Sequence, residues 1–149
     1  MNRRAGDMIE DKNHDKNKKK ILVIDDEEDL CVLLRHGLTL ERTDLEVLSA
    51  KDGPTGLQRA KMDQPLVIIL DVMMPRMDGY EVCRRLKADP ATRRIPVVML
   101  TASNDPQLNR KAFEAGAIAC LNKPYRRATL VNCVDMALGS SARHRERAV

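Results

Sequence analysis

The stretch LVIILDVMMPRMDG, residues 66–79, decides the fold of this chain. Five consecutive apolar residues lead to a single aspartate, Asp71, which is followed by a Met-Pro turn that ends at a glycine. A short apolar run without polar alternation is typical of a strand buried on both faces, as in a parallel sheet. We therefore expect Asp71 to stand at the carboxyl end of a central strand.

Short apolar runs and amphipathic segments alternate on both sides of this stretch. The apolar runs predict strands at residues 21–24, 45–50, 66–70, 97–100 and 117–121. Apolar residues at helical spacing predict helices at residues 29–40, 55–62, 80–88, 106–115 and 128–138. Strands that alternate with helices in this way predict an α/β fold, a doubly wound parallel sheet covered by helices on both faces.

Turn and cap residues set the ends of the predicted helices. Asp105 and Pro106 are expected at the start of the fourth helix, and Gly116 just past its end. The run Gly139-Ser140-Ser141 is expected to stop the fifth helix. One domain is therefore predicted over residues 20–139.

Both ends of the chain differ in composition from this domain. Residues 1–19 form a polar, basic tail and residues 140–149 an Arg-rich tail, and both are expected to be disordered. Much of the formal charge of +4 falls in these tails. They could contact an acidic partner or serve only solubility.

The composition excludes several classes of protein. With no Trp, two Tyr and one Phe, the chain offers no aromatic platform for stacking nucleic-acid bases. No apolar run reaches the roughly 18–20 residues of a membrane helix, and no signal peptide precedes the domain, so we expect a cytoplasmic protein. The four cysteines form no CxxC pair and the three histidines no ligand spacing, which favours reduced, buried thiols over zinc or disulfides.

Five polar side chains follow the predicted strands. Ligands of open α/β sheets bind at the carboxyl ends of the strands, where the strand order reverses. The residues expected at that edge are Asp25 and Asp26 after the first strand, Asp71 after the third, Thr101 after the fourth and Lys123 after the fifth.

Three carboxylates crowded together repel one another unless a cation compensates. Mg²⁺ takes oxygen ligands and often combines one or two carboxylates with phosphate oxygens. With three aspartates, Mg²⁺ and Lys123, the formal charges sum to zero. Each residue also has a simpler interpretation: the acidic run as a solvated helix start, Asp71 or Thr101 as a turn residue, and Lys123 as a surface lysine.

The arrangement favours phosphoryl transfer to a carboxylate. A carboxylate can attack phosphorus and form an acyl phosphate when a metal and an ammonium neutralise the developing charge. Asp71 is the candidate nucleophile, with Asp25 and Asp26 as candidate metal ligands. Lys123 would bridge Asp71 or the phosphoryl oxygens, and Thr101 would donate a hydrogen bond to the phosphoryl group.

These residues resemble the receiver domain of bacterial two-component response regulators, including the stand-alone chemotaxis regulators. The resemblance covers residues 20–138. The matching motifs are ILVIDDEEDL at 21–30, LDVMMPRMDGYE at 70–81, TAS at 101–103, AGA at 115–117 and the Lys123-Pro124 pair.

The resemblance implies a flavodoxin-like receiver fold with strand order 2-1-3-4-5 and a cis Lys123-Pro124 bond. It also implies a role for each residue of the edge: Asp71 as phosphoacceptor, Asp25 and Asp26 as the acidic pair at Mg²⁺, the backbone carbonyl of Met73 as a further metal ligand, Thr101 as the switch hydroxyl and Lys123 as the essential lysine.

The resemblance further implies the partners. A sensor histidine kinase or a histidine phosphotransfer protein would donate the phosphoryl group, which is later lost to water. Such a domain is no enzyme beyond its own phosphorylation and slow dephosphorylation. The fourth helix, fifth strand and fifth helix would then bind a separate output protein or a second copy of the chain. Because eleven residues follow Leu138, we expect a stand-alone receiver.

One position departs from the family pattern. Many receivers carry Tyr or Phe three residues before the lysine, where this chain has Cys120. The signal is then expected to pass through the loop and helix of residues 101–116. The other functions considered are a phosphohydrolase, which lacks its second aspartate because Met73 occupies that position, an unphosphorylated interaction module, and a DNA-binding regulator using the basic tails, which we do not expect.

Overall fold

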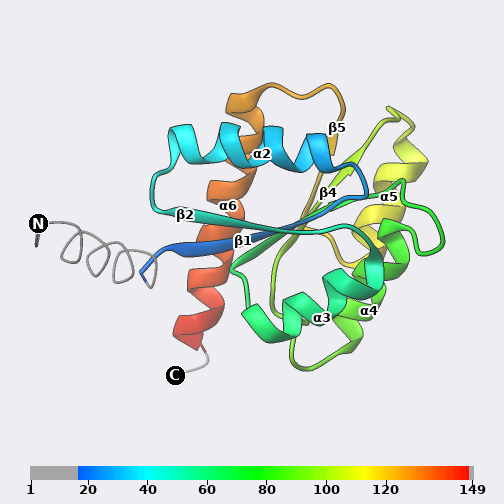
Figure 1. Cartoon of the computed structure of the whole chain (residues 1–149). Helices are drawn as coiled ribbons and strands as arrows, with labels where there is room; N and C mark the ends of the chain where they lie inside the picture. The colour runs from blue at the N-terminus through cyan, green and yellow to red at the C-terminus, as the bar shows by residue number, and fades with distance from the viewer. Residues whose placement is uncertain (1–16, 148–149) are drawn as a thin grey trace, which may run out of the picture.

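A computed structural model describes residues 17–147, with side chains described up to Ser141. Five parallel strands form one sheet with the order β2-β1-β3-β4-β5 (Figure 1). The strands are β1 (Lys19–Ile24), β2 (Leu45–Ala50), β3 (Val67–Asp71), β4 (Val97–Thr101) and β5 (Ala119–Asn122). The doubly wound fold and the strand order predicted from the resemblance are both confirmed.

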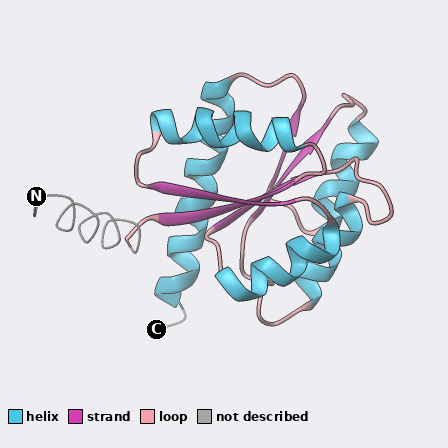
Figure 2. Cartoon of the chain, viewed as in Figure 1, coloured by secondary structure: helices cyan, strands magenta, loops and turns pink. Residues whose placement is uncertain are grey.

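Five helices in the described part of the chain connect or follow these strands (Figure 2). They are α2 (Glu28–Glu41), α3 (Gly53–Asp63), α4 (Gly79–Ala88), α5 (Pro106–Ala115) and α6 (Arg127–Arg147). All strands and the first four of these helices begin and end within two residues of the predicted bounds. The last helix does not.

Each strand buries side chains on both faces of the sheet. Along β1, Ile21 and Val23 pack with residues of α2 and α6, such as Leu34 and Val134. The alternate residues Leu22 and Ile24 pack with residues of α3, α4 and α5. This two-sided burial explains why the strands read as continuous apolar runs in the sequence.

The predicted cap residues bind the backbone at the helix ends. The Asp105 carboxylate accepts a hydrogen bond from the Gln107 N–H at 2.9 Å, and Pro106 is the first residue of α5. Gly116 follows α5 with a φ of 111°, a left-handed conformation that favours glycine. Asp52 and Asp78 cap α3 and α4 in the same way as Asp105.

The prediction that Gly139-Ser140-Ser141 stops the last helix is wrong. Helix α6 continues to Arg147, so residues 140–147, assigned to a disordered tail, are helical. An interior glycine costs a helix only about 1 kcal/mol relative to alanine. Leu130, Val134 and Ala137 of α6 are buried against the sheet, and this packing holds the helix in place.

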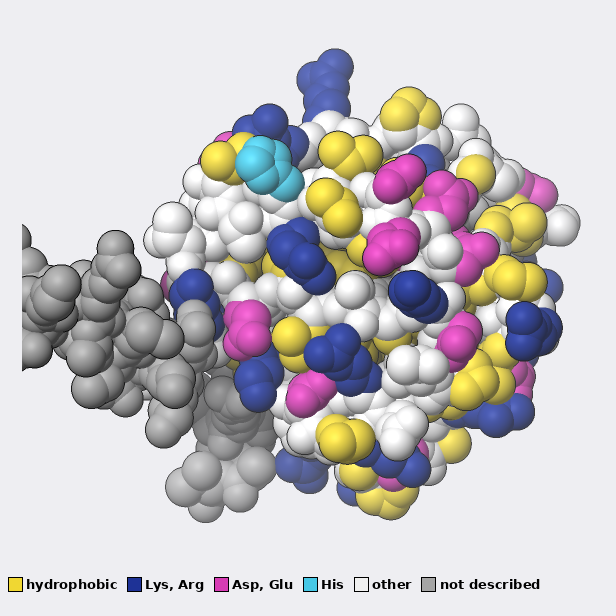
Figure 3. Space-filling view, viewed as in Figure 1, with side chains coloured by type: hydrophobic (Ala, Val, Ile, Leu, Met, Phe, Trp, Pro, Cys, Tyr) yellow, Lys and Arg dark blue, Asp and Glu magenta, His cyan; other side chains and the backbone are white. Residues whose placement is uncertain are grey.

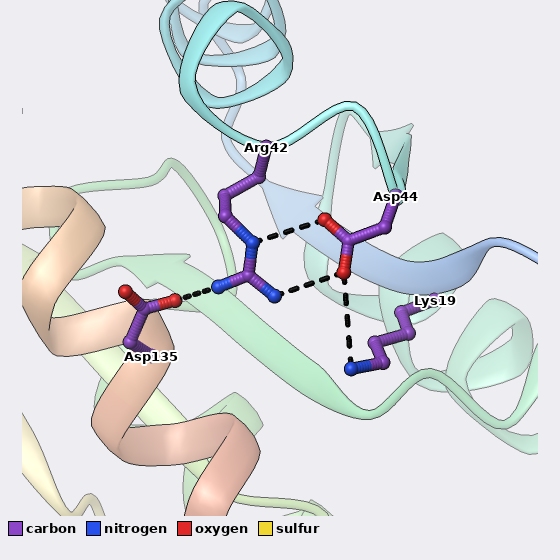
Figure 4. A network of polar contacts seen from close by, with 4 residues as sticks. All are labelled: Lys19, Arg42, Asp44 and Asp135. Atoms are coloured by element: carbon purple, nitrogen blue, oxygen red, sulfur yellow. Dashed lines mark hydrogen bonds and ion pairs between the residues drawn. The ribbon is translucent and has the colours of Figure 1, made fainter.

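Surface ion pairs tie α6 to the opposite edge of the sheet. Arg42, just after α2, donates two hydrogen bonds of 2.9 Å to Asp44 and a further one to Asp135 of α6 (Figure 4). Lys19 of β1 lies 3.8 Å from the same Asp44 carboxylate. Exposed ion pairs of this kind contribute about 0–1 kcal/mol each to stability, so they add little to the packing of α6 against the sheet.

The remaining sequence expectations have mixed outcomes. Strand β1 begins at Lys19, one residue before the predicted domain boundary, and the rest of the N-terminal tail lies mostly outside the described residues. All four cysteines are free thiols; Cys31 and Cys83 are buried, as expected, whereas Cys120 and Cys133 are only half-buried. No helix in the described part of the chain is long and apolar enough to cross a bilayer.

The course of α6 predicts the effect of two glycine substitutions. Gly139→Ala should raise the free energy of unfolding by about 0.5–1 kcal/mol, because the helix runs through this position and a methyl group there meets no heavy atom within 4 Å. Gly116→Ala is the control and should lower it, because its φ of 111° disfavours a side chain. Urea denaturation measures both. Destabilisation by Gly139→Ala would contradict a continuous helix.

Candidate functional site

The register of the sheet brings the predicted polar residues to one edge. Ile24 of β1 pairs with Leu70 of β3, so Asp25 and Asp71 both come next along their strands. Asp71 pairs with Leu100, and Thr101 of β4 pairs with Asn122 of β5, directly before Lys123. The strand ends of β1, β3, β4 and β5 therefore meet at the carboxyl edge.

Three carboxylates form a cluster at this edge. Each of Asp25, Asp26 and Asp71 offers an oxygen that lies within 4.8 Å of the others. Asp25 and Asp71 are buried, with exposed fractions of 1% and 4%, whereas Asp26 is exposed. Figure 3 shows further carboxylates grouped beside the start of α2, where the acidic run continues. The cluster therefore has two buried members and one that opens to solvent.

Asp25 is the most constrained of the three carboxylates. Its Oδ1 accepts a hydrogen bond from the Glu27 N–H at 2.9 Å, whereas its buried Oδ2 has no hydrogen-bond partner. Burial raises the pKa of Asp25 from 3.8 to about 6, and the charge of Asp71 adds to the rise while the Glu27 N–H opposes it. A buried carboxylate oxygen without a partner, among two other carboxylates, fits a hard divalent cation.

Lys123 supplies a positive charge beside the cluster. Its Nζ lies 3.1 Å from Asp71 Oδ1, within hydrogen-bond distance, and 3.9 Å from Asp25 Oδ2. Its backbone N–H donates to the Thr101 carbonyl at 2.7 Å, and the Lys123-Pro124 bond is cis, as expected. Burial raises the pKa of Asp71, and the nearby Lys123 ammonium opposes this rise.

The loop after Asp71, residues 72–78, returns tightly to the strand. The Gly79 N–H donates to the Val72 carbonyl at 2.9 Å, and a Cβ at Gly79 would lie 2.4 Å from the Asp71 carbonyl oxygen. No side chain fits there, so the close approach of the chain to the strand requires a glycine at residue 79. Met73 is 71% exposed, and its backbone N–H donates a hydrogen bond to the Asp71 carboxylate, which opposes the rise in the pKa of Asp71.

Thr101 is buried, and its hydroxyl begins a chain of hydrogen bonds toward α5. Thr101 Oγ1 accepts from the Ser103 N–H at 3.2 Å, and Ser103 Oγ accepts from the Asp105 N–H at 3.1 Å. Asp105 in turn caps α5 at Gln107. The sequence indicated the cap at Asp105 but not the two preceding bonds, because these depend on the side-chain conformations of Thr101 and Ser103.

All predicted site side chains therefore lie together at the carboxyl edge. Two further features were missed from the sequence: the Ser103 hydrogen bond to Thr101 and the buried Tyr80, which packs in the same core cluster that Cys120 borders. The only sequence signal for Tyr80 is its place directly after Gly79, which the apolar pattern of the following helix did not emphasise.

The whole of this region matches a known family. The family model of the response regulator receiver domain matches residues 21–135, which include every residue of the carboxyl edge described above. This chain belongs to the response regulator receiver family. It is a receiver domain, a signalling domain of two-component systems, as the sequence motifs predicted.

Curated relatives include longer regulators. Response regulator PleD of Caulobacter vibrioides is 50% identical over 105 residues, which are 70% of this chain and 23% of PleD. The alkaline phosphatase synthesis transcriptional regulatory protein PhoP of Bacillus subtilis is 40% identical over 107 residues, 72% of this chain and 43% of PhoP. The chain thus spans less than half the length of these two relatives.

Solved structures of similar size share the fold. A putative response regulator from Chloroflexus aurantiacus matches with a TM-score of 0.76 and 34% identity, covering 82% of this chain and 98% of that one. The Vibrio cholerae chemotaxis protein CheY4 matches with a TM-score of 0.74 and 30% identity, covering 81% and 99%. The receiver fold therefore accounts for nearly all of those two chains.

The raised pKa of Asp25 predicts a pH-dependent effect of Asp25→Asn. Without metal at pH 7, the variant should be more stable by up to about 3 kcal/mol, because a rise from 3.8 to about 6 costs about 1.4 kcal/mol per unit when the carboxylate is charged. The folded state binds the proton of the Asp25 carboxyl more tightly than the unfolded chain does. The stability of the wild type is therefore unaffected below pH 3.8 and falls as the pH rises through 6, where Asp25 becomes charged in the folded state. The gain should therefore vanish near pH 4.

Urea denaturation in EDTA at pH 7.5 and pH 4.5 measures this difference. Asp26→Asn is the matched control, since its carboxylate is exposed and should contribute less to stability. An equal gain at both pH values, or a loss at pH 7.5, would contradict the burial of a charged Asp25.

Proposed function

We propose that this receiver domain accepts a phosphoryl group on Asp71 in a reaction that depends on Mg²⁺. The observation that carries the proposal is the position of Asp71. It is buried at the end of the central strand, 3.1 Å from the Lys123 ammonium, in a cluster with Asp25 and Asp26. A nucleophilic carboxylate beside a fixed cation suits phosphoryl transfer.

Asp25, Asp26 and Asp71, together with the backbone carbonyl of Met73, are the proposed ligands of the metal. When bound, Mg²⁺ supplies positive charge to the oxygens of the transferring phosphoryl group. The three carboxylates, Mg²⁺ and Lys123 sum to zero formal charge. The orphaned Asp25 Oδ2 would gain a partner on metal binding, which its burial makes favourable.

The transfer itself forms one bond and breaks one. A carboxylate oxygen of Asp71 bonds to phosphorus as the bond between phosphorus and the donor imidazole nitrogen breaks, and the electron pair of that bond stays on the nitrogen. Lys123 stabilises the charge on the phosphoryl oxygens. The donor we propose is a histidine of a sensor kinase or a histidine phosphotransfer protein, and water later removes the phosphoryl group.

Thr101 links the phosphoryl group to α5. Its hydroxyl accepts from the Ser103 N–H, and turning it to donate to a phosphoryl oxygen would break that bond. Ser103 holds Asp105, the cap of α5, so the change reaches the start of this helix. This route uses the loop at residues 101–105 and requires no aromatic side chain at Cys120.

The proposed output surface consists of α5, β5 and α6. It carries exposed apolar side chains, including Phe113 of α5 and Met136 of α6, with exposed fractions of 53% and 49%. A shift of α5 would change how this surface presents Phe113 to a partner. The partners we propose are a separate output protein or a second copy of the domain.

Replacing Asp71 with asparagine should abolish phosphorylation, because the amide is a poor nucleophile at phosphorus and lacks the negative charge. Intact-mass spectrometry after incubation with acetyl phosphate and Mg²⁺ should give the mass of one added phosphoryl group for the wild type and none for Asp71→Asn. Phosphorylation of the variant to the wild-type extent would exclude Asp71 as the acceptor.

Excess chelator is the control for the metal. Removing Mg²⁺ should stop phosphorylation of the wild type, and adding it back should restore the reaction, because the uncompensated carboxylates repel the dianionic donor. Phosphorylation that persists in chelator would contradict the metal requirement while leaving the acceptor assignment intact.

A further inference from the structure

Tyr80 is a buried aromatic residue whose position ties it to the acceptor strand. It is the second residue of α4, directly after Gly79, and its exposed fraction is 6%. Gly79 is held close to the strand, because its N–H is bound to the Val72 carbonyl and an added Cβ there would lie 2.4 Å from the Asp71 carbonyl oxygen. The backbone of Tyr80 is therefore joined directly to a residue that is bound to the chain next to Asp71.

The other end of the Tyr80 side chain is bound to α5. Its hydroxyl donates a hydrogen bond to the Leu108 carbonyl in the first turns of α5, at 3.2 Å. The Lys111 ammonium of the same helix lies 5.1 Å from the centre of the Tyr80 ring, a cation–π distance. A single side chain thus joins the residue next to the acceptor loop to the end of α5 that faces the site.

The far end of α5 is held by a different kind of contact. The aliphatic stem of Lys87 of α4 packs against Gly116, where a Cβ would lie 2.6 Å from Lys87 Cγ. The Lys87 ammonium is fixed in turn by the carbonyls of Ile95 and Arg93, at 2.7 and 3.2 Å. Helix α5 is therefore anchored at its C-terminal end, and its N-terminal end depends on Tyr80 and on the Asp105 cap.

We propose that Tyr80 is a positioning residue that couples the acceptor loop to α5, and so transmits phosphorylation to the output surface. This inference rests on the proposed function of Asp71. Two connections converge on the first turns of α5: the chain from Thr101 through Ser103 to Asp105, and the Tyr80 hydroxyl at Leu108. When the phosphoryl group rearranges the hydrogen bonds from Thr101 to Asp105, the Tyr80 hydrogen bond to Leu108 sets the position of α5 relative to the acceptor loop.

The half-buried Cys120 of β5 provides no side-chain connection to α5 of the kind that Tyr80 makes. Cys120 packs against the core cluster that contains Tyr80 and offers neither a ring nor a hydroxyl to α5. Within the described residues, the chain's other tyrosine, Tyr125, packs with the opposite core cluster, on the α2 and α6 face of the sheet. Tyr125, on the other face of the sheet, can therefore serve as the control for substitutions at Tyr80.

Tyr80→Phe removes only the hydroxyl and is the test of this coupling. Amide hydrogen exchange at residues 106–115 is measured with and without acetyl phosphate and Mg²⁺, with intact mass confirming the phosphorylated fraction in each sample. One hydrogen bond of this kind carries a factor of about 5 in an equilibrium. The change in α5 exchange on phosphorylation should therefore be about fivefold smaller in Tyr80→Phe than in the wild type.

Two measurements separate coupling from a merely structural role. Tyr80→Phe should accept the phosphoryl group within about twofold of the wild-type extent, because the hydroxyl does not contact Asp71. The matched control Tyr125→Phe should keep the full phosphorylation-dependent change in α5 exchange. Tyr80→Met, which keeps an apolar side chain, is a second variant in case Tyr80→Phe lowers stability. For each variant, the exchange of the unphosphorylated protein is subtracted from that of the phosphorylated protein. Tyr80→Met should then show the same loss of the change in α5 exchange.

The outcomes are distinct. A full α5 response in Tyr80→Phe, or a response lost only in Tyr125→Phe, overturns the role of Tyr80. A phosphorylated wild type whose α5 exchange does not change overturns it as well. A wild type that gains no phosphoryl mass overturns the proposed function of Asp71 instead, and with it the basis of this inference.

Discussion

The crowding of negative charge at one edge of the sheet is the constraint on which this structure depends. Asp25, Asp26 and Asp71 bring carboxylate oxygens within 4.8 Å of one another, and two of these residues are almost fully buried. Burial and mutual repulsion both disfavour the charged forms, as the raised pKa values of Asp25 and Asp71 indicate. The Lys123 ammonium, 3.1 Å from Asp71, opposes this effect, as do the backbone N–H groups of Glu27 at Asp25 and of Met73 at Asp71. The folded domain therefore holds a site whose charge is balanced only when a cation binds.

The rest of the domain keeps these groups in place. The register of β1, β3 and β4 sets Asp25, Asp71 and Thr101 at the same edge, and Gly79 lets the chain after Asp71 pass close to the strand. Holding like charges together costs stability, which is common where a site is built for a ligand. Burial of apolar side chains on both faces of the sheet offsets the stability lost at the carboxylate cluster.

In the proposed function, a change of charge at Asp71 would be transmitted to α5, a helix whose two ends are held by different kinds of contact. Lys87 packs against Gly116 at the C-terminal end of α5. At its start, Ser103 Oγ accepts a hydrogen bond from the Asp105 N–H, and the Tyr80 hydroxyl donates one to the Leu108 carbonyl. If α5 responds, we expect it to pivot about its packed C-terminal end rather than to translate. The proposed output surface of α5, β5 and α6 would then change shape.

Much of this fold could be predicted because its signals are local. Continuous apolar runs mark two-sided strands, and Asp105, Pro106 and Gly116 mark the ends of α5 through their own backbone preferences. The end of α6 could not be predicted in this way, because a glycine costs a helix only about 1 kcal/mol relative to alanine, and α6 continues past Gly139 to Arg147. The Tyr80 contact with Leu108 joins residues 28 positions apart, and no sequence pattern reports a hydrogen bond between two helices.

The most direct test of the central claim is to locate the phosphoryl group itself. Borohydride reduces an acyl phosphate to an alcohol, so a phosphorylated aspartate becomes homoserine, which peptide mass spectrometry can assign to one residue. After treatment with acetyl phosphate and Mg²⁺, homoserine is predicted at residue 71 and absent from residues 25 and 26. Homoserine at residue 25 or 26, or at no residue of a protein that has gained phosphoryl mass, would contradict a carboxyl edge built around Asp71.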